Sequence, residues 1–287
     1  DMQIAAEWAA NKLREVGLHN VEIMPTSGHP VVFAESTGSK AKPTILIYGH
    51  YDVQPIDPID ERDSPPFEPT LKQDQLYARG VSDMKSQIVS ILAALDAVHQ
   101  TKYTLPATIK IILEGEEEIG SPNLAKYIEQ HKDLLQCDFS LNMDSGILDP
   151  DIPAIVYGLR GLAYFDLCVR GPESDLHSGH YGGAVHNPAQ VLCELIASMH
   201  DHDGRVTLRG FYDKVKPLDE EERTSLASTA PNEQAFLAAA ANPPALHGEF
   251  GYSTQERVSI RPTLEVNGIH SGFTGHGSKT VLPAKAI

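Results

Sequence analysis

The chain has 287 residues, enough for one large core or for two domains, because single cores stop growing at about 250 to 300 residues. Its hydrophobic content of 41% and charged content of 22% are typical of globular proteins. No apolar run approaches the roughly 20 residues that span a bilayer. The formal charge of −16 disfavours nucleic acids and anionic membranes as partners, because both are bound through clustered Lys and Arg.

The cysteines and the first residues of the chain bear on its cellular compartment. Cys137, Cys168 and Cys193 are widely spaced and odd in number, which argues against a disulfide framework and against a Cys-x-x-Cys metal site. The opening residues DMQIAAEWAANKLREVG lack the basic stretch, apolar block and cleavage site of a signal peptide. We therefore expect a cytoplasmic protein with reduced cysteines.

Apolar periodicity predicts helices alternating with strands in the first half of the chain. Residues 3–16 and 86–100 each carry an apolar stripe at helical spacing. A third helix is predicted at 121–135, with Ser121 as its cap and Pro122 at its first position. Short apolar runs bounded by turn residues predict buried strands at 44–48, 107–113, 137–143 and 153–157. This alternation predicts an α/β fold with a mostly parallel sheet.

The pattern of residue types changes near residue 160. A strand-like run at 162–171 precedes a glycine-rich segment, and a helix follows with Asn187 as its cap. One side of this helix carries an apolar stripe, formed by Val191, Leu192, Leu195, Ile196 and Met199. The stripe is either a dimer surface or the face that packs on the domain's own sheet. We predict two domains, over residues 1–158 and 159–287.

A histidine and a carboxylate follow the strand predicted at 44–48. His50 and Asp52 lie two residues apart in the segment GHYD. In parallel sheets, ligands bind beyond the carboxyl ends of the strands. A metal-bound imidazole needs an acceptor on its other ring nitrogen, which Asp52 is placed to provide. A pair of this kind in a loop is more often structural, so its weight depends on the neighbouring clusters.

Asp83 lies in the segment RGVSDMK, which leads into the helix predicted at 86–100. Two interpretations are open for its carboxylate, a helix cap or a metal ligand. Gly80 indicates a backbone that needs unusual freedom, which is consistent with a turn that directs a carboxylate inward.

Carboxylates crowd at the end of the strand predicted at 107–113. They are Glu114, Glu116, Glu117 and Glu118. A solvated acidic loop is the alternative, but adjacent carboxylates at a buried strand end repel one another and are costly without a cation. Asp144 follows the strand predicted at 137–143 in the same way.

These clusters share one place in the predicted fold. Each lies just past the carboxyl end of a predicted parallel strand or at the entrance of the next helix. Together they predict an oxygen-rich pocket with one histidine. Imidazole and carboxylate ligands without thiolate suit zinc, manganese or cobalt, and two such ions roughly 3.5 to 4 Å apart are used for peptide hydrolysis.

Six motifs occur in an order found in a known family. They are GHYDVQP, SPPFEP, LYARGVSDMK, LEGEEEIGS, DLHSGHYGGAVHNP and GSKTVLP, spread over residues 49–283. On these motifs the chain resembles the zinc aminoacylase/carboxypeptidase family of metallopeptidases, and HYDVQP, SPPFEP and LHSGHYGG are most similar to its dipeptidase branch. The resemblance implies an α/β zinc-peptidase catalytic domain, an α+β lid and dimerisation domain, and hydrolysis of small peptides.

The resemblance also implies roles for individual residues. Two divalent ions, zinc before manganese or cobalt, would have four protein ligands, namely His50, Asp83, Glu118 and Asp144. Asp83 would bridge both ions, and Asp52 would orient His50. Glu117 would be the general base that takes a proton from a water between the ions and passes it to the leaving amine. Glu114 and Glu116 receive no role.

Three residues of the second domain match positions that contact the substrate in the family. His177 matches a histidine that in related dimers reaches from one subunit into the active site of the other. The resemblance therefore implies a homodimer. Arg261 and Asn267 lie in RPTLEVNG, a segment where family members hold the substrate carboxylate.

The chain departs from the family pattern at both ends. Family members begin earlier than Asp1 and continue beyond Ile287, where they supply one more metal-ligand histidine. We therefore expect a truncated chain. Three functions stay open: a metal-dependent dipeptidase as the main hypothesis, an N-acyl-amino-acid deacylase of the same family, and an inactive fragment that acts only as a folding or dimerising module.

Overall fold

A computed structural model describes residues 1–36, 43–101, 105, 107–146 and 155–287. The chain divides into two compact units, residues 1–146 and 147–287. The domain boundary that we predict after residue 158 lies further along the chain than this division and stays a prediction. No helix in the described ranges is long and apolar enough to span a membrane.

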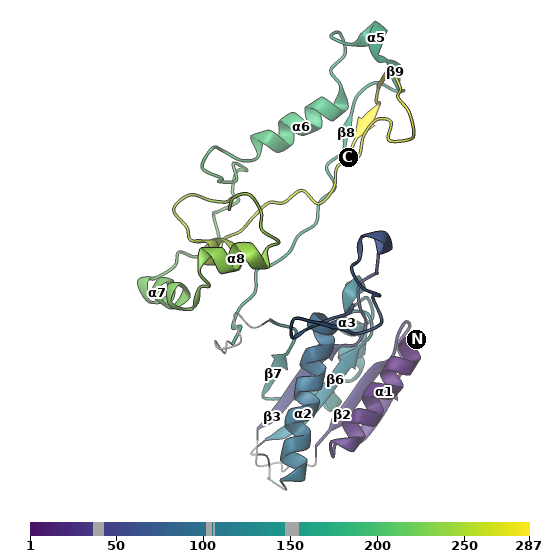
Figure 1. Ribbon diagram of the computed structural model, residues 1–287, viewed down its shortest axis with the longest axis vertical. Coiled ribbons are helices and arrows are strands. Elements are labelled where there is room, and N and C mark those ends of the chain that lie inside the picture. The colour runs from purple at the N-terminus through teal and green to yellow at the C-terminus, as the bar shows by residue number, and fades with distance from the viewer. Residues whose placement is uncertain (37–42, 102–104, 106, 147–154) are drawn as a thin grey trace. The chain divides into compact units, whose positions relative to one another are not determined.

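The first unit is built on a five-stranded mixed sheet (Figure 1). Its strands are β1 (His19–Met24), β2 (Val31–Glu35), β3 (Thr44–His50), β6 (Thr108–Glu114) and β7 (Phe139–Asn142). Their order across the sheet is β1-β2-β6-β3-β7. The strands β6, β3 and β7 are parallel, whereas β2 is antiparallel to both of its neighbours. The predicted α/β class and the strands predicted at 44–48, 107–113 and 137–143 are confirmed.

The strand β6 is the centre of the sheet, and all of its residues are buried. A strand covered on both faces carries apolar residues on each of them, and the inner residues of β6 are apolar except for Lys110. Its register with β3 runs from Thr44 opposite Thr108 to His50 opposite Glu114. The two strands therefore end level with each other, and the residues that follow them emerge at one edge of the sheet.

One face of the sheet is covered by α1 (Met2–Glu15) and α2 (Ser86–Gln100), as Figure 1 shows. Small residues of α1, among them Ala6 and Ala10, are fully buried in this core, so the helix lies close to the strands. Ile88 and other apolar residues of α2 pack in the same core. Both helices were predicted at these places and are confirmed.

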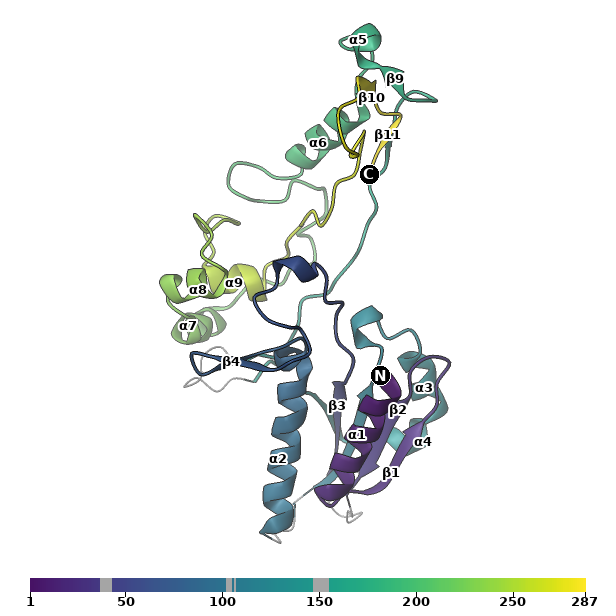
Figure 2. The same ribbon diagram turned by 45° about the vertical axis from the view of Figure 1, so that its right-hand side comes forward.

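The opposite face is covered by α3 (Leu124–Gln130) and α4 (Lys132–Leu135) (Figure 2). Tyr127 and Leu135 are buried there together with Phe33 of β2. A helical segment was predicted in this region as one continuous helix. The structure divides it in two and starts it later.

The predicted helix cap at Ser121 is wrong. The helix α3 begins at Leu124, with Asn123 at the N-cap position. Ser121 has a φ of 50°, and its hydroxyl donates to the Glu114 carboxylate at 2.8 Å. Because this buried acceptor takes the hydroxyl, Ser121 does not cap the helix, and Pro122 lies outside it.

The other elements of the first unit are short. They are η1 (Ile59–Glu61), β4 (Thr70–Lys72), β5 (Gln75–Tyr77), η2 (Val81–Lys85) and η3 (Glu117–Ile119). The strands β4 and β5 form an antiparallel hairpin. The turn η2 leads directly into α2, and η3 follows β6 within the acidic segment, so both of these turns carry residues of the predicted site.

The second unit combines helices with very short strands. Its helices are α5 (Ser178–Tyr181), α6 (Pro188–Ser198), α7 (Glu220–Thr229), α8 (Glu233–Ala239) and α9 (Thr254–Ser259). Its strands are β8 (Val169–Arg170), β9 (Leu176–His177), β10 (Val281–Leu282) and β11 (Lys285–Ala286). The strand β9 pairs with β10, and β8 pairs with β11, both antiparallel.

The helix α6 begins where the sequence predicts it. The side chain of Asn187 accepts a hydrogen bond from the backbone of Ala189 at 2.9 Å, and Pro188 is the first helical residue. The helix packs against β8 and β11, with Leu192 buried and Leu195 exposed. The apolar stripe thus packs partly on the unit's own strands, and its use as a dimer surface stays a prediction.

Two strands predicted near the start of the second unit are wrong in their described parts. Residues 153 and 154 lie outside the described residues, and residues 155–157 form no strand. Of the run at 162–171, only Val169–Arg170 is a strand. The side chain of Phe165 in this run is 90% exposed. An apolar run becomes a strand only where another strand supplies hydrogen bonds, and its composition does not reveal that partner.

Shortening Ile111 at the centre of the sheet should destabilise the first unit. Ile111 is 1% exposed in β6, so Ile111→Ala leaves a cavity and should cost about 2 to 5 kcal/mol of unfolding free energy. Urea unfolding followed by fluorescence of Trp8, the single tryptophan and part of α1, measures this cost. The matched control is Ile59→Ala, at a 54% exposed position, and equal losses for the two variants would contradict the assigned core.

Candidate metal centre

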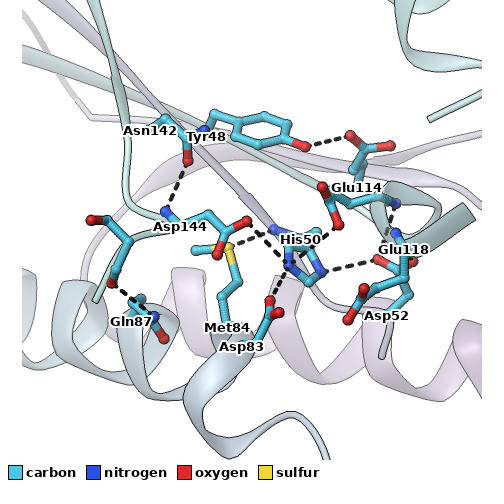
Figure 3. Close-up of polar contacts among 12 residues, drawn as sticks. Tyr48, His50, Asp52, Asp83, Met84, Gln87, Glu114, Glu118, Asn142 and Asp144 are labelled. Carbon is cyan, nitrogen blue, oxygen red and sulfur yellow. Dashed lines mark hydrogen bonds and ion pairs between the residues drawn. The ribbon is translucent and has the colours of Figure 1, made fainter. Parts of the chain in front are cut away.

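The carboxyl ends of the parallel strands bring the predicted site residues together. The strand β3 ends at His50, β6 ends at Glu114, and Asp144 follows shortly after β7. Figure 3 shows Asp52, Asp83 and Asp144 gathered around the imidazole of His50. Side chains that are far apart in the sequence thus form one acidic cluster with a histidine at its centre.

The imidazole of His50 is fully buried and contacts carboxylates on both sides. Its Nδ1 lies 3.2 Å from Oδ1 of Asp52. Its Nε2 lies 3.0 Å from Oδ1 of Asp83 and 3.7 Å from Oδ2 of Asp144. With Nδ1 held by Asp52, the lone pair of a neutral imidazole would be on Nε2 and directed at the other two carboxylates.

The pKa values of the cluster record an excess of negative charge. Burial lowers the pKa of His50, but Asp52, Asp83 and Asp144 outweigh it and raise the value to about 9. Burial and the charge of Asp83 raise the pKa of Asp144. The cluster therefore attracts a proton or another cation.

The Asp83 carboxylate points into the cluster and does not cap a helix. Gly80 precedes it with a φ of 78°, and the backbone at Asp83 itself is not helical (φ −138°, ψ 99°). The N-cap position of α2 is Lys85, which has no side-chain cap bond. A side chain at Gly80 would lie 2.3 Å from Cγ1 of Val53, so the turn needs a glycine there. Of the two interpretations left open, the geometry favours the ligand.

The carboxylates of the acidic segment differ in their hydrogen-bond partners. Glu114 accepts from Tyr48 and Ser121, Glu116 accepts from Asn123, and Glu118 accepts from Gln54. The carboxylate of Glu117 accepts no hydrogen bond from any described residue, and its Oε2 lies 3.9 Å from Nε2 of His50. Burial raises the pKa of Glu117, and the neighbouring acidic groups add to the rise, although His50 opposes it.

Three side chains have the geometry of a metal site. His50, Asp83 and Asp144 each offer one ligand atom, and these atoms lie within 4.8 Å of one another. No other set of this kind occurs among the described residues. One imidazole and two carboxylates form a donor set that suits zinc and other borderline divalent ions. The residues present therefore fit a divalent cation.

The carboxylate of Glu118 does not join this set in the structure. Its Oε2 accepts from Nε2 of Gln54 at 2.6 Å, and its Oε1 accepts from the backbone of Gln54 at 3.1 Å. Gln54 was missed by the sequence analysis, although it lies in the motif GHYDVQP. Met84 was also missed: it is fully buried, and its Sδ accepts from the backbone of His50 at 3.1 Å. Its place beside Asp83 in SDMK was the available signal.

In the second unit, His177 is exposed and precedes α5 as its N-cap. Its Nδ1 accepts from the backbone of Gly179 at 3.1 Å, and its Nε2 lies 3.3 Å from the hydroxyl of Thr280. Its ring stacks on His180 with centroids 4.5 Å apart. The imidazole is thus held on the surface of its own unit, and its contact with a substrate stays a prediction.

Arg261 and Asn267 have different surroundings. Arg261 is buried and forms a two-pronged ion pair with Glu249, with Nε to Oε2 at 2.8 Å and Nη2 to Oε1 at 2.9 Å. Its guanidinium also lies 4.1 Å from the ring centre of Tyr252. Asn267 is exposed. Their predicted contact with a substrate carboxylate stays a prediction, and for Arg261 the Nε and Nη2 atoms already donate to Glu249 within the unit.

Comparison with known families shows which family the chain belongs to. The family model described as Peptidase family M20/M25/M40 matches residues 46–273. The chain belongs to peptidase family M20/M25/M40. The matched range includes every residue of the acidic cluster. The resemblance drawn from the six motifs is confirmed.

Curated relatives in this peptidase family are named as dipeptidases. The chain is 34% identical to the Beta-Ala-His dipeptidase of Homo sapiens over 264 residues, which are 90% of this chain and 51% of that protein. It is 31% identical to the Cys-Gly metallodipeptidase dug1 of Schizosaccharomyces pombe over 277 residues, which are 96% of this chain and 58% of that protein. The chain thus spans about half the length of the curated relatives it matches.

Solved structures in the M20 family share the fold. The M20 family metallo-carboxypeptidase Sso-CP2 of Sulfolobus solfataricus is 37% identical, with a TM-score of 0.80 over 99% of this chain and 64% of that chain. Human carnosine dipeptidase 1 is 31% identical, with a TM-score of 0.73 over 99% of this chain and 62% of that chain. These matches support the α/β class for the chain.

Removing the imidazole at the centre of the cluster should weaken metal binding. His50→Ala deletes one of three ligand atoms and leaves the two carboxylates without an orienting partner, so zinc affinity should fall at least about tenfold. Calorimetric titration with zinc measures this change. His202→Ala, at an exposed histidine, is the matched control. Unchanged zinc affinity in His50→Ala would contradict the site.

Removing the Arg261 side chain should destabilise the second unit. Arg261→Ala leaves the buried Glu249 paired with Arg205 alone, and the expected cost is about 3 kcal/mol. Urea unfolding followed by near-ultraviolet circular dichroism of the tyrosines measures it, with the exposed Arg209→Ala as control. A rise in KM for a peptide substrate at unchanged stability would instead favour a direct contact between Arg261 and the substrate.

Proposed function

We propose that the chain is a metal-dependent dipeptidase. The observation that carries this proposal is the group of possible ligands His50, Asp83 and Asp144 beside the Glu117 carboxylate, which accepts no hydrogen bond from a described residue. Membership of peptidase family M20/M25/M40 and the dipeptidase names of the relatives support it. Because the chain spans about half of those relatives, this activity is proposed for the chain and is tested on it directly.

Zinc is the ion that we propose for the site. His50, Asp83 and Asp144 would hold one ion, because imidazole nitrogen and carboxylate oxygen are both zinc ligands. For a second ion, the family resemblance adds Glu118 to Asp83, and the Glu118 carboxylate would exchange its bonds to Gln54 for the metal. Bound ions of this kind polarise a scissile carbonyl and lower the pKa of water.

Glu117 is the group that we propose to move the proton. A general base needs a free acceptor atom within reach of the reacting water and a pKa raised toward neutrality. Its carboxylate accepts no hydrogen bond in the described part of the chain, and its pKa is raised by burial and by neighbouring acidic groups. Its Oε2 could therefore take a proton from water and later give it to the leaving amine.

Asp52 sets the position of both the ligand and the base. Its Oδ1 lies 3.2 Å from Nδ1 of His50 and accepts the backbone N–H of Glu117 at 3.3 Å. Its Oδ2 accepts the backbone N–H of Glu118 at 3.0 Å. We propose that Asp52 orients the reacting groups and does not itself exchange protons with the substrate.

The substrate class follows from the relatives. Two curated relatives are named for dipeptides, Beta-Ala-His and Cys-Gly, and a similar solved structure is named a metallo-carboxypeptidase. Dipeptides are therefore the first substrates to test, and carboxyl-terminal release from longer peptides is the second. No observation favours N-acyl amino acids over dipeptides.

The assembly and the cellular compartment complete the proposal. We propose a homodimer in which His177 of one copy serves the site of the other, which the family resemblance and the exposed position of His177 support. We propose a cytoplasmic protein, since Cys137, Cys168 and Cys193 are all free thiols.

Replacing Glu117 by glutamine should abolish turnover while metal binding persists. Glu117→Gln keeps the size of the side chain and removes the proton acceptor, so kcat should fall by about 100- to 10,000-fold. Hydrolysis of the dipeptides β-alanyl-histidine and cysteinyl-glycine by the zinc-loaded chain measures kcat, and elemental analysis measures bound zinc. Glu129→Gln, on the exposed side of α3, is the control.

Two results would contradict the proposal. Full turnover by Glu117→Gln would remove Glu117 from its role as the base. Absence of turnover in the unaltered chain with zinc bound would favour the alternative that this chain folds without hydrolysing peptides.

A further inference from the structure

Glu114 is a buried carboxylate that the proposed function does not use. It is the last residue of β6, and it is 3% exposed. Tyr48 donates to its Oε1 at 2.6 Å, and the hydroxyl of Ser121 donates to the same oxygen at 2.8 Å (Figure 3 draws the first of these bonds). Two donors from different segments therefore converge on one carboxylate oxygen.

These donors come from two separate segments, and each segment carries a residue of the proposed centre. Tyr48 lies in β3, two residues before His50. Ser121 closes the acidic segment, because its backbone N–H donates to the carbonyl of Glu116 at 2.8 Å. The neighbouring N–H of Gly120 donates to the carbonyl of Glu117, also at 2.8 Å. The Glu114 carboxylate thus links the strand that carries His50 to the far end of the turn that carries Glu117.

The backbone of Glu114 makes a parallel link. Its carbonyl accepts the N–H of Tyr51 at 2.8 Å, directly after His50. A side chain at Gly115, the next residue, would lie 2.6 Å from the ring of Tyr51, so the turn leaves β6 in close contact with that ring. A buried carboxylate is retained only where hydrogen bonds compensate its lost hydration, and here both donors belong to the frame of the site.

We infer that Glu114 is a positioning residue for the proposed base: by holding Ser121 and Tyr48 on one oxygen, it fixes the turn of residues 115–121 relative to His50. This inference rests on the proposed role of Glu117. No hydrogen bond or ion pair among the described residues joins the Glu114 carboxylate to the ligand side chains or to the Glu117 carboxylate, so it acts through the backbone of the turn. A shift of about 1 Å in a reacting group can cost on the order of 100-fold in rate.

The two bonds allow a test that separates geometry from charge. Both donors use Oε1, so the single carbonyl oxygen of a glutamine can accept both while the negative charge is lost. Glu114→Gln should therefore keep the turn in place and keep kcat within about twofold of the unaltered chain, whereas Glu114→Leu removes both acceptors. Ser121→Ala removes only the hydroxyl bond to Glu114, keeps the backbone bond of Ser121 to Glu116, and serves if Glu114→Leu does not fold.

The experiment combines kinetics with hydrogen exchange. In Ser121→Ala and Glu114→Leu, kcat for β-alanyl-histidine should fall roughly 10- to 100-fold, with KM within about twofold and bound zinc unchanged. Amide exchange across residues 117–121, read by mass spectrometry, should quicken about tenfold in both variants and stay unchanged in Glu114→Gln. Ser90→Ala, a serine on the exposed side of α2, is the control.

Three outcomes would overturn the inference. One is unchanged exchange and unchanged kcat in Ser121→Ala. Another is an equal loss of kcat in Glu114→Gln and Glu114→Leu, which would assign the effect to charge. The third is a rise in KM at constant kcat. Failure of the proposed function is distinguishable, because full turnover by Glu117→Gln would contradict the base, while the exchange data would still decide whether Glu114 holds the turn.

Discussion

A single carboxylate, that of Asp52, joins the ends of two parallel strands. Its Oδ1 contacts the imidazole of His50 at the end of β3, and its two oxygens accept the backbone N–H groups of Glu117 and Glu118 after β6. Burial raises the pKa of Asp52, but these bonds outweigh burial and hold it below its usual value. Because one anion holds both segments, the imidazole and the acidic turn cannot move independently. The rest of the site is arranged around these contacts of Asp52.

The balance of charge follows from this arrangement. Neutral donors satisfy the carboxylates that only support the site: Tyr48 and Ser121 bind Glu114, and Asn123 binds Glu116. No Lys or Arg forms an ion pair with the carboxylates of the cluster within the described residues. The negative charge that remains is concentrated where His50 meets its acidic neighbours. Carboxylates this close together repel one another unless a cation neutralises them, so the charge distribution is consistent with a cation-binding site.

Local patterns predicted the parts of the fold that local forces decide. The strands ending at His50 and Glu114 are predominantly apolar runs bounded by turn residues, and the structure has strands at both places. The position of the acidic clusters at the strand ends followed from that alternation alone. The sequence alone could not separate the proposed ligand role of Asp83 from a helix cap, because only the fold shows that its backbone is not helical and that α2 begins after it.

The errors arose where a distant partner decides the outcome. Ser121 reads as a cap, but Glu114, seven residues earlier, takes its hydroxyl. The run at 162–171 has the composition of a strand, yet it pairs only at Val169–Arg170. Hydrogen bonds of this kind depend on tertiary packing, which a single sequence does not display.

The central place of β6 has a consequence for the order in which a growing chain can fold. The strands β2 and β3 are made early, but they do not pair with each other, because β6 lies between them. The sheet therefore cannot close until β6, which ends at residue 114, has emerged from the ribosome. Contacts this far apart in sequence slow folding and leave apolar strands open to association. During synthesis the apolar residues of β2 and β3 are thus left uncovered until β6 is complete, and the site cannot form before then.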